Sequence, residues 1–240
     1  MFRTVIWFIY FVLYMLYSLG PLLRVNRLIK TNQYQLAEQR TTKIATHWAK
    51  SLIKLTGSTV EIHGLENIPQ RNVLFISNHQ GNFDIPLLIG YINKPKGFIA
   101  KVELKKLPIV NLWMDKINCV FMDRSNVRQS MKAIQKGIEH LKNGKSMVLF
   151  PEGTRSKGPT MGQFKPGSMK LALKSQVPIV PVTINGSYKI LEQNGFIMKP
   201  THVKIVVGEP IYVYNLSKEE QAGLSTIIRD KIAANLQHDL

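Results

Sequence analysis

The chain has 240 residues, 45% of them hydrophobic, which is enough for one domain with a sizeable core and excludes a disordered chain. Its 32 lysine and arginine residues against 15 aspartate and glutamate residues leave a formal charge of +17, which favours partners that carry phosphate: nucleic acid, an anionic membrane surface or phosphorylated substrates. The single cysteine, Cys119, excludes an intrachain disulfide and a cysteine-based zinc site.

The first predicted element is an apolar segment that fits a membrane. Residues 4–23 carry no charge and include several aromatic side chains: Trp7, Phe8, Tyr10, Phe11, Tyr14 and Tyr17. Because this stretch is longer than the hydrophobic region of a signal peptide and no clear cleavage site follows it, we expect a retained membrane anchor. If the segment spans the bilayer, the basic residues Arg24, Arg27 and Lys30 place the chain that follows on the cytoplasmic face of the cell membrane.

The next predicted helix, over residues 35–55, leaves a second arrangement open. Ile44 and Trp48 lie on one face of this helix, whereas Lys43 and Lys50 lie elsewhere. A basic amphipathic helix can lie in the membrane interface, so the two segments could form a shallow hairpin in one leaflet. The apolar face could equally pack on the rest of the protein.

From about residue 57 the sequence alternates short β-rich runs with helical ones, as in an α/β fold. The candidate strands are Val60–Ile62, Val73–Ile76, Gly97–Ala100, Cys119–Phe121, Met147–Phe150, Ile179–Ile184 and Val203–Val207. Several are continuously apolar, as strands covered on both faces are. We therefore expect an α/β fold with a central, mostly parallel or mixed sheet flanked by helices, preceded by an N-terminal membrane-associated helical segment.

Two later helices are predicted from apolar residues at spacings of three and four. The helix over residues 127–142 should bury one such row: Val127, Met131, Ile134, Ile138 and Leu141. The helix over residues 217–236 should bury another: Leu224, Ile227, Ile228 and Ile232.

The stretch SNHQGNFD, residues 77–84, follows a predicted strand and carries a His and an Asp five residues apart. On one continuous helix this offset would turn the two side chains about 140° apart. Pro86 favours a helix that begins near Asp84, so we expect His79 in the preceding loop, where Gly81 lets the chain turn back. Asp84 can then hydrogen-bond one ring nitrogen of His79 and leave the other as a general base for an alcohol. Asp84 could also be no more than a helix cap.

Charged residues also follow two other predicted strands. Glu152, Gly153, Thr154 and Arg155 come together after one of them, where glycine permits close backbone approach and Arg155 can hold an anionic group by two parallel hydrogen bonds. Arg124 follows another strand in the same way. Each cluster alone could be structural, but three strand ends that carry a His–Asp pair and two arginines indicate a site.

These clusters resemble the motifs of a known family. NHQGNFD (residues 78–84) resembles the NHxxxxD motif of the glycerolipid acyltransferases, and FPEGTRS (150–156) resembles their FPEGTRS motif. VFMDR (120–124) is similar to their second motif, and VPIVPV (177–182) is similar to their proline-containing fourth motif, in the same order. The resemblance spans roughly residues 72–185. Within the family, the best match is to the 1-acyl-sn-glycerol-3-phosphate acyltransferases of bacterial type.

The resemblance implies an enzyme that transfers an acyl chain to the sn-2 hydroxyl of lysophosphatidic acid and gives phosphatidic acid in phospholipid synthesis. His79 would be the general base on that hydroxyl, with Asp84 orienting it. The hydroxyl would attack the thioester of acyl-CoA or acyl carrier protein directly, without an acyl-enzyme. The residues themselves agree with such a direct attack, because Cys119 lies outside the His79 motif and no Gly-x-Ser-x-Gly nucleophile elbow occurs.

The resemblance also implies which residues bind substrate. Arg124 and Arg155 would bind the glycerol phosphate. The same pocket would be shaped by three residues of the third motif: Glu152, Gly153 and Thr154. Two further residues are weaker candidates: Lys101 and Pro181. Residues 1–56 would then be membrane-anchoring helices and residues 57–240 an acyltransferase catalytic domain.

The expected partners are membrane lipids, lysophosphatidic acid and the acyl donor, acyl-CoA or acyl carrier protein. We expect no other cofactor and no metal, because His and carboxylate residues do not cluster at ligand spacing. A related acyltransferase that uses glycerol 3-phosphate or another lysophospholipid would share the same His–Asp chemistry. A membrane-tethered nucleic-acid-binding protein would fit the charge, but we expect no nucleic acid, since aromatic residues are not interleaved with the basic ones.

Overall fold

The computed structural model describes residues 1–236 and has a seven-stranded sheet at its centre. The strands lie in the order β1-β7-β6-β2-β5-β3-β4, and every neighbouring pair is parallel except β6 and β7. Their bounds are β1 Thr59–His63, β2 Leu74–Ser77, β3 Lys96–Lys101, β4 Val120–Met122, β5 Ser146–Leu149, β6 Ile179–Asn185 and β7 His202–Val207. The predicted α/β fold and its mostly parallel, mixed sheet are confirmed, and each strand end lies within one residue of the expected position.

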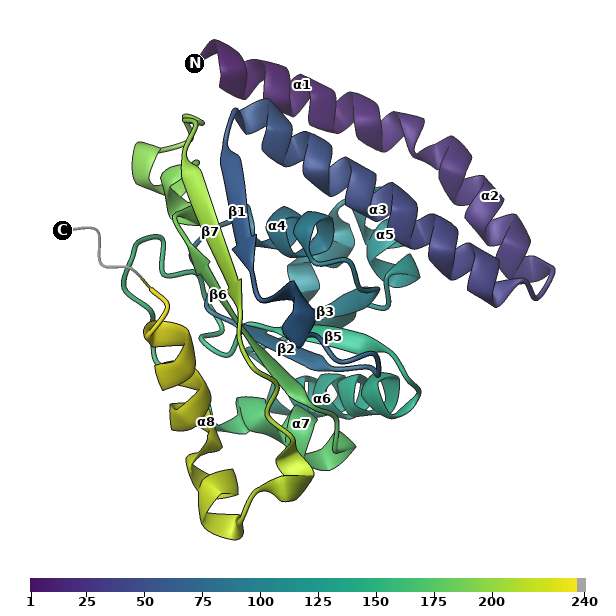
Figure 1. Ribbon diagram of the computed structural model, residues 1–240. Coiled ribbons are helices and arrows are strands. Elements are labelled where there is room, and N and C mark those ends of the chain that lie inside the picture. The colour runs from purple at the N-terminus through teal and green to yellow at the C-terminus, as the bar shows by residue number, and fades with distance from the viewer. Residues whose placement is uncertain (237–240) are drawn as a thin grey trace.

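Helices cover both faces of this sheet (Figure 1). Alternate strand residues separate two clusters of buried side chains: Phe75 and Val148 belong to one, and Ile76 and Met147 to the other. The first face carries α1 (Phe2–Tyr17), α3 (Tyr34–Thr56), α4 (Asp84–Tyr91) and α5 (Val110–Lys116). The second face carries α6 (Val127–Lys142), α7 (Lys170–Ser175) and α8 (Lys218–Ala233). Strands buried on both faces explain the continuously apolar runs.

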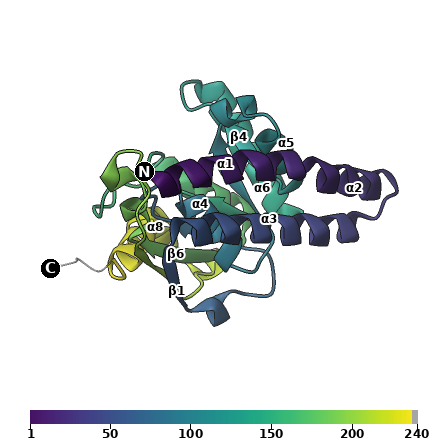
Figure 2. The ribbon, with the colours of Figure 1, turned by 90° about the horizontal axis from the view of Figure 1, so that it is seen from above.

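The N-terminal helices form a long hairpin beside the sheet. The chain breaks direction slightly at Ser18, continues as α2 (Leu19–Lys30) and returns as α3, so that α1 and α2 lie alongside α3 (Figures 1 and 2). Trp7 anchors the hairpin, because its indole Nε1 donates to the Leu52 carbonyl at 3.0 Å. Arg3 donates to the Thr56 carbonyl at 2.6 Å. The apolar side of α3 therefore packs within the protein; the division at residue 56 stays a prediction.

The outer face of α1 and α2 is apolar. By length and composition alone, residues 2–30 could cross a membrane, and 22% of their most apolar stretch is buried within the protein. Many large apolar side chains of this segment are exposed: Phe2, Val5, Ile6, Phe8, Ile9, Val12, Leu13, Leu16 and Leu23. Soluble proteins seldom expose so continuous an apolar surface, so it indicates a contact with membrane or protein.

The helix α6 has the expected bounds and buries part of the expected row: Ile138 and Leu141 are buried, and Ile134 packs against the same cluster. Val127 and Met131 are 75% and 67% exposed, so their predicted burial is wrong. Small residues of α6 complete the buried face, and Gly137 fits closely, because a Cβ there would lie 2.6 Å from Leu171 Cδ2. The buried residues of α6 are Ala133, Gly137, Ile138 and Leu141. The apolar period missed Ala133 and Gly137, because alanine and glycine were not counted as part of the row.

We expect Gly97→Ala to lower the free energy of unfolding by about 1–3 kcal/mol, as overpacking of a core does. A Cβ at position 97 would lie 2.2 Å from the backbone oxygen of Asn118 in the turn before β4. The matched control is Gly223→Ala in α8, where a Cβ meets nothing within 4 Å. Helix propensity should make this control neutral or stabilising by up to about 1 kcal/mol. Denaturant unfolding in detergent compares them, and equal midpoints would contradict the packing argument.

Candidate active site

His79 and Asp84 meet across the loop between β2 and α4. His79 Nδ1 lies 2.7 Å from Asp84 Oδ2, and the Asp84 side chain is fully buried. Because an ionised carboxylate only accepts hydrogen bonds, Nδ1 carries the proton and Nε2 is left as the basic atom. The residue that caps α4 is Phe83, so Asp84 is not the helix cap. The imidazole also stacks on Phe150, with ring centroids 4.0 Å apart, and this contact restricts its rotation.

Three carboxylates hold the backbone of this loop. Glu152 accepts from the His79 N–H at 2.7 Å, and Asp84 accepts from the Gly81 N–H at 2.9 Å. Glu192 accepts from the Asn82 N–H at 2.7 Å. Burial raises the pKa of the Glu152 and Glu192 carboxyls, and these backbone hydrogen bonds oppose that shift by stabilising the charged form. The loop conformation that presents His79 thus depends on charges from three separate segments.

Glu152 also shapes the segment that follows β5. Its Oε2 accepts from the Gly162 N–H at 2.7 Å while Oε1 holds His79, so one side chain ties two loops together. Gly153 follows with a left-handed φ of 74°, which favours glycine. The loops are joined a second time, because the Ser156 N–H donates to the His79 carbonyl at 2.8 Å.

A cavity of about 270 Å³ connects His79 with the N-terminal helices. Its polar lining includes two guanidinium groups, those of Arg124 and Arg155. Its body is apolar and is lined from four helices, by residues such as Met15 of α1, Ile44 of α3, Ile89 of α4 and Trp113 of α5. The cavity is therefore amphipathic: its lining combines a base and two positive charges with an apolar sleeve from the helices.

The two arginines differ in their surroundings. Arg155 Nη1 donates to Asn82 Oδ1 and lies 3.6 Å from Glu192 Oε1, so its orientation is tied to the loop that carries His79. Arg124 is partly buried, and this burial lowers the pKa of its guanidinium, while the nearby Glu103 opposes the shift. Arginine stays protonated at neutral pH, so both positive charges remain in the cavity.

The structure brings most of the predicted site residues to this cavity. Those that line it are His79, Lys101, Arg124, Gly153, Thr154 and Arg155. Asp84 and Glu152 do not line it and act on its shape through His79. Pro181 lies inside β6, where it pairs with Ile76, and is not part of the lining.

Two residues near the site escaped the sequence analysis. Ser187 is fully buried, and its hydroxyl donates to Asp84 Oδ1. Glu192 is the third carboxylate of the loop. Ser187 lies two residues after the end of β6, so the strand-end argument that singled out His79 could have found it; no local pattern marks Glu192. Among residues 1–236, no group of three His, Cys, Asp or Glu side chains is placed to hold a metal ion.

Comparison with known proteins finds one family. Residues 59–185 match the acyltransferase family. The chain is 34% identical to the 1-acyl-sn-glycerol-3-phosphate acyltransferase of Borreliella burgdorferi over 76% of this chain and 74% of that protein. It is 30% identical to the 1-acyl-sn-glycerol-3-phosphate acyltransferase of Saccharomyces cerevisiae over 84% of this chain and 67% of that protein.

A solved structure resembles nearly the whole chain. The crystal structure of the 1-acyl-sn-glycerophosphate (LPA) acyltransferase, PlsC, from Thermotoga maritima matches with a TM-score of 0.87 and 30% sequence identity. The match covers 98% of this chain and 93% of that chain. It therefore includes the N-terminal helices as well as the sheet.

We expect Ser187→Ala to lower the free energy of unfolding by about 1.5–3 kcal/mol, the usual range for a hydrogen bond to a charged group. The reason is that Asp84 is fully buried and would lose the hydroxyl that satisfies Oδ1. The control is the same substitution in an Asp84→Ala background, where the contact is already absent and the loss should be clearly smaller. Additive losses in denaturant unfolding would show that the two side chains are not coupled.

Proposed function

The chain belongs to the acyltransferase family, and we propose that it transfers an acyl chain from a thioester to the sn-2 hydroxyl of lysophosphatidic acid, giving phosphatidic acid. One observation carries the proposal: His79, held through Nδ1 by a buried carboxylate, lines the same cavity as two arginines and an apolar sleeve. A lysophospholipid offers a hydroxyl, a phosphate and an acyl chain, and the cavity provides a matching group for each.

The reaction needs one proton transfer each way. His79 Nε2 takes the proton of the hydroxyl as its oxygen attacks the thioester carbonyl, and a C–O bond forms. The C–S bond of the resulting tetrahedral intermediate then breaks, and the imidazolium returns the proton to the leaving thiolate. Asp84 stabilises the imidazolium between these steps and keeps the ring in the tautomer that leaves Nε2 free. No covalent acyl-enzyme forms.

Arg124 and Arg155 bind the phosphate of the acceptor in this proposal. Two guanidinium groups suit a phosphate because each can donate two parallel hydrogen bonds. Gly153 and Thr154 shape the pocket beside them, and Lys101 adds a further positive charge to its lining. Glu152 contributes through the loop that it holds. Pro181 has only a structural role in this proposal: it lies in β6 and supports the site of the acceptor or of the acyl chain.

The acyl donor is the thioester of acyl-CoA, of acyl carrier protein, or of both, and we propose no other cofactor. The apolar sleeve gives an acyl chain a place that excludes water. An acyltransferase for glycerol 3-phosphate or another lysophospholipid would use the same base, so the choice of acceptor has to be measured.

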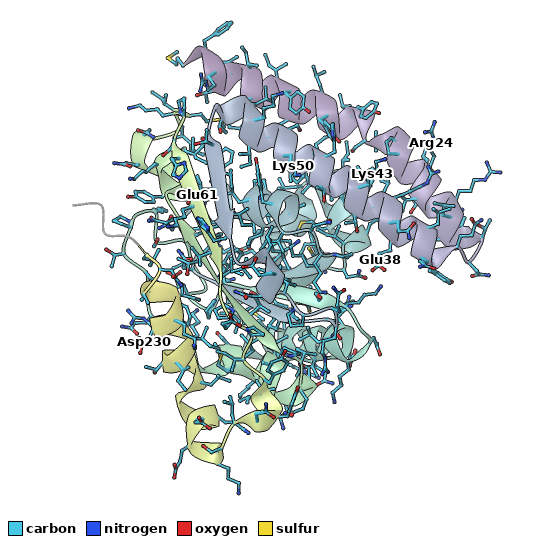
Figure 3. All side chains as sticks on the ribbon, viewed as in Figure 1. Arg24, Glu38, Lys43, Lys50, Glu61 and Asp230 are labelled. Atoms are coloured by element: carbon cyan, nitrogen blue, oxygen red, sulfur yellow. The ribbon has the colours of Figure 1, made fainter. Side chains whose placement is uncertain are left out.

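We also propose that the N-terminal hairpin lies in one leaflet of the cell membrane, with the catalytic domain on the cytoplasmic face. Because α1 is fixed along α3, a hairpin that crossed the bilayer would carry the charges of Lys43 and Lys50 into hydrocarbon (Figure 3). Such burial is costly. An interfacial position instead immerses the exposed apolar side of α1 and leaves Arg24 near anionic headgroups.

We expect His79→Ala to reduce phosphatidic acid formation by about 10²- to 10⁴-fold, the usual contribution of a general base. The assay presents lysophosphatidic acid in detergent micelles with oleoyl-CoA or an acyl carrier protein thioester. His63→Ala, on the exposed edge of β1, is the control and should keep the wild-type rate. An unchanged rate without His79 would refute its role. Acylation only of glycerol 3-phosphate or of another lysolipid would show that lysophosphatidic acid is not the acceptor.

We expect the double variant Ile9→Asp and Leu13→Asp to bind anionic vesicles at least about tenfold more weakly, because each apolar side chain contributes about 1.5–3 kcal/mol when it leaves water. Both side chains are more than half exposed, so the fold should tolerate the change. The control is Ala222→Asp with Thr226→Asp on α8, which has the same spacing and charge. Equal loss of co-sedimentation in both variants would contradict insertion of α1.

A further inference from the structure

The exposed side of α6 combines three cations with two apolar side chains. Arg128, Lys132 and Lys136 follow one another at intervals of four residues, so they form one row about 12 Å long on the helix. Val127 and Met131 each precede one of these cations by one residue, which places them about 100° round the helix from the row, and they are 75% and 67% exposed. We call these five residues the α6 basic face. Protein interfaces commonly combine apolar contacts with a charged or polar surround.

The charges of the α6 basic face have no partner within the described protein. None of its three cations forms an ion pair with any of residues 1–236. The only acidic residue of α6 is Glu139, which accepts a hydrogen bond from Gln135. Like charges four residues apart repel one another and destabilise a helix. An acidic partner would relieve this repulsion, so charge complementarity identifies the sign of what binds there.

The position of α6 distinguishes a soluble partner from a membrane. α6 packs on the second face of the sheet with α7 and α8, whereas α1 and α3 cover the first face (Figure 1). The side of α6 that points away from the sheet therefore points away from the apolar outer face of α1. A membrane that receives α1 cannot reach the α6 basic face at the same time, and the remaining occupant is an acidic molecule in the aqueous phase.

The α6 basic face also lies close to the cavity along the chain. Arg124 lines the cavity, and Arg128 follows four residues later, which limits their Cα separation to about 14 Å. A partner seated on α6 would thus lie near Arg124, which lines the same cavity as His79. Only a flexible arm is then needed to carry a thioester from the partner to the base.

We propose that the α6 basic face is the docking surface for an acidic acyl carrier protein, which delivers the acyl chain as a thioester on a flexible arm. The proposal rests on the acyl transfer proposed above and specifies its donor. Arg128, Lys132 and Lys136 attract the acidic carrier, and Val127 and Met131 contact apolar residues of the docked protein. Acyl-CoA, which has no protein surface, reaches the cavity without this contact.

The test compares two donors that carry the same acyl chain. We expect the triple variant Arg128→Glu, Lys132→Glu and Lys136→Glu to raise KM for the acyl carrier protein thioester about tenfold or more, because reversed charges repel the acidic carrier. KM for acyl-CoA and kcat with both donors should change less than about twofold. The control variant reverses three exposed lysines elsewhere: Lys199, Lys218 and Lys231. It changes net charge equally and should leave both KM values near wild type.

A second variant tests the apolar part without changing charge. Val127→Ser with Met131→Ser should raise KM for the carrier thioester about threefold or more and leave KM for acyl-CoA unchanged, since exposed apolar groups contribute at the centre of an interface. Both side chains are exposed, so thermal unfolding should match wild type.

Several results would overturn the proposal. An equal effect of the variant on both donors would mean that α6 acts on the acyl group or on folding. If the wild-type enzyme uses acyl-CoA but not the carrier thioester, the carrier protein is not its partner. Weaker vesicle binding by the charge-reversal variant would assign the surface to the membrane. If the wild-type enzyme transfers an acyl chain from neither donor to any lysophospholipid, the proposed function itself fails. That result differs from an active enzyme whose α6 variant affects both donors equally.

Discussion

The candidate site depends on hydrogen bonds from the backbone N–H groups of one short loop to three buried carboxylates. Burial alone would disfavour these charges, and for Glu152 and Glu192 it is the largest influence on the pKa. Hydrogen bonds to charged acceptors are about twice as strong as those between neutral groups, so the loop and the carboxylates stabilise one another. His79 gains a fixed position from an arrangement that would otherwise be costly.

The strand order explains why the carboxylates come from where they do. β2 lies between β5 and β6 in the sheet, so the segments that follow these two strands flank the loop that follows β2. Glu152 comes from one side and Glu192 from the other. Ends of parallel strands often form binding sites in this way, because they place loops from distant parts of the chain at one edge. The site therefore exists only once the sheet is assembled.

The cavity joins this edge to the N-terminal helices. Its polar lining includes Arg124 after β4 and Arg155 after β5, whereas its sleeve needs residues of α1 and α3 such as Met15 and Ile44. The hairpin thus has two tasks in the proposed enzyme: its outer face meets the lipid, and its inner face completes the space for an acyl chain. With α6 on the opposite face of the sheet, the lipid acceptor and a soluble donor would approach from different sides.

Much of this protein followed from the sequence by itself. Apolar runs, turn residues and helical periods are properties of neighbouring residues, so the seven strands and the bounds of α6 could be predicted from them. The spacing of His79 and Asp84, with Pro86 behind them, was enough to expect a hydrogen bond across a loop.

Other features depended on contacts that no local pattern encodes. Ser187 and Glu192 reach the loop from more than 100 residues away, and the sequence does not state the strand order that brings them there. Val127 and Met131 share the period of a buried row, yet both are exposed in the folded protein, while Ile138 and Leu141 of the same row are buried. The sequence by itself determined the elements and the chemistry of one loop, because both arise between neighbours in the chain. Only the tertiary structure decided which faces were buried and which charges met, because strand order and packing set those contacts.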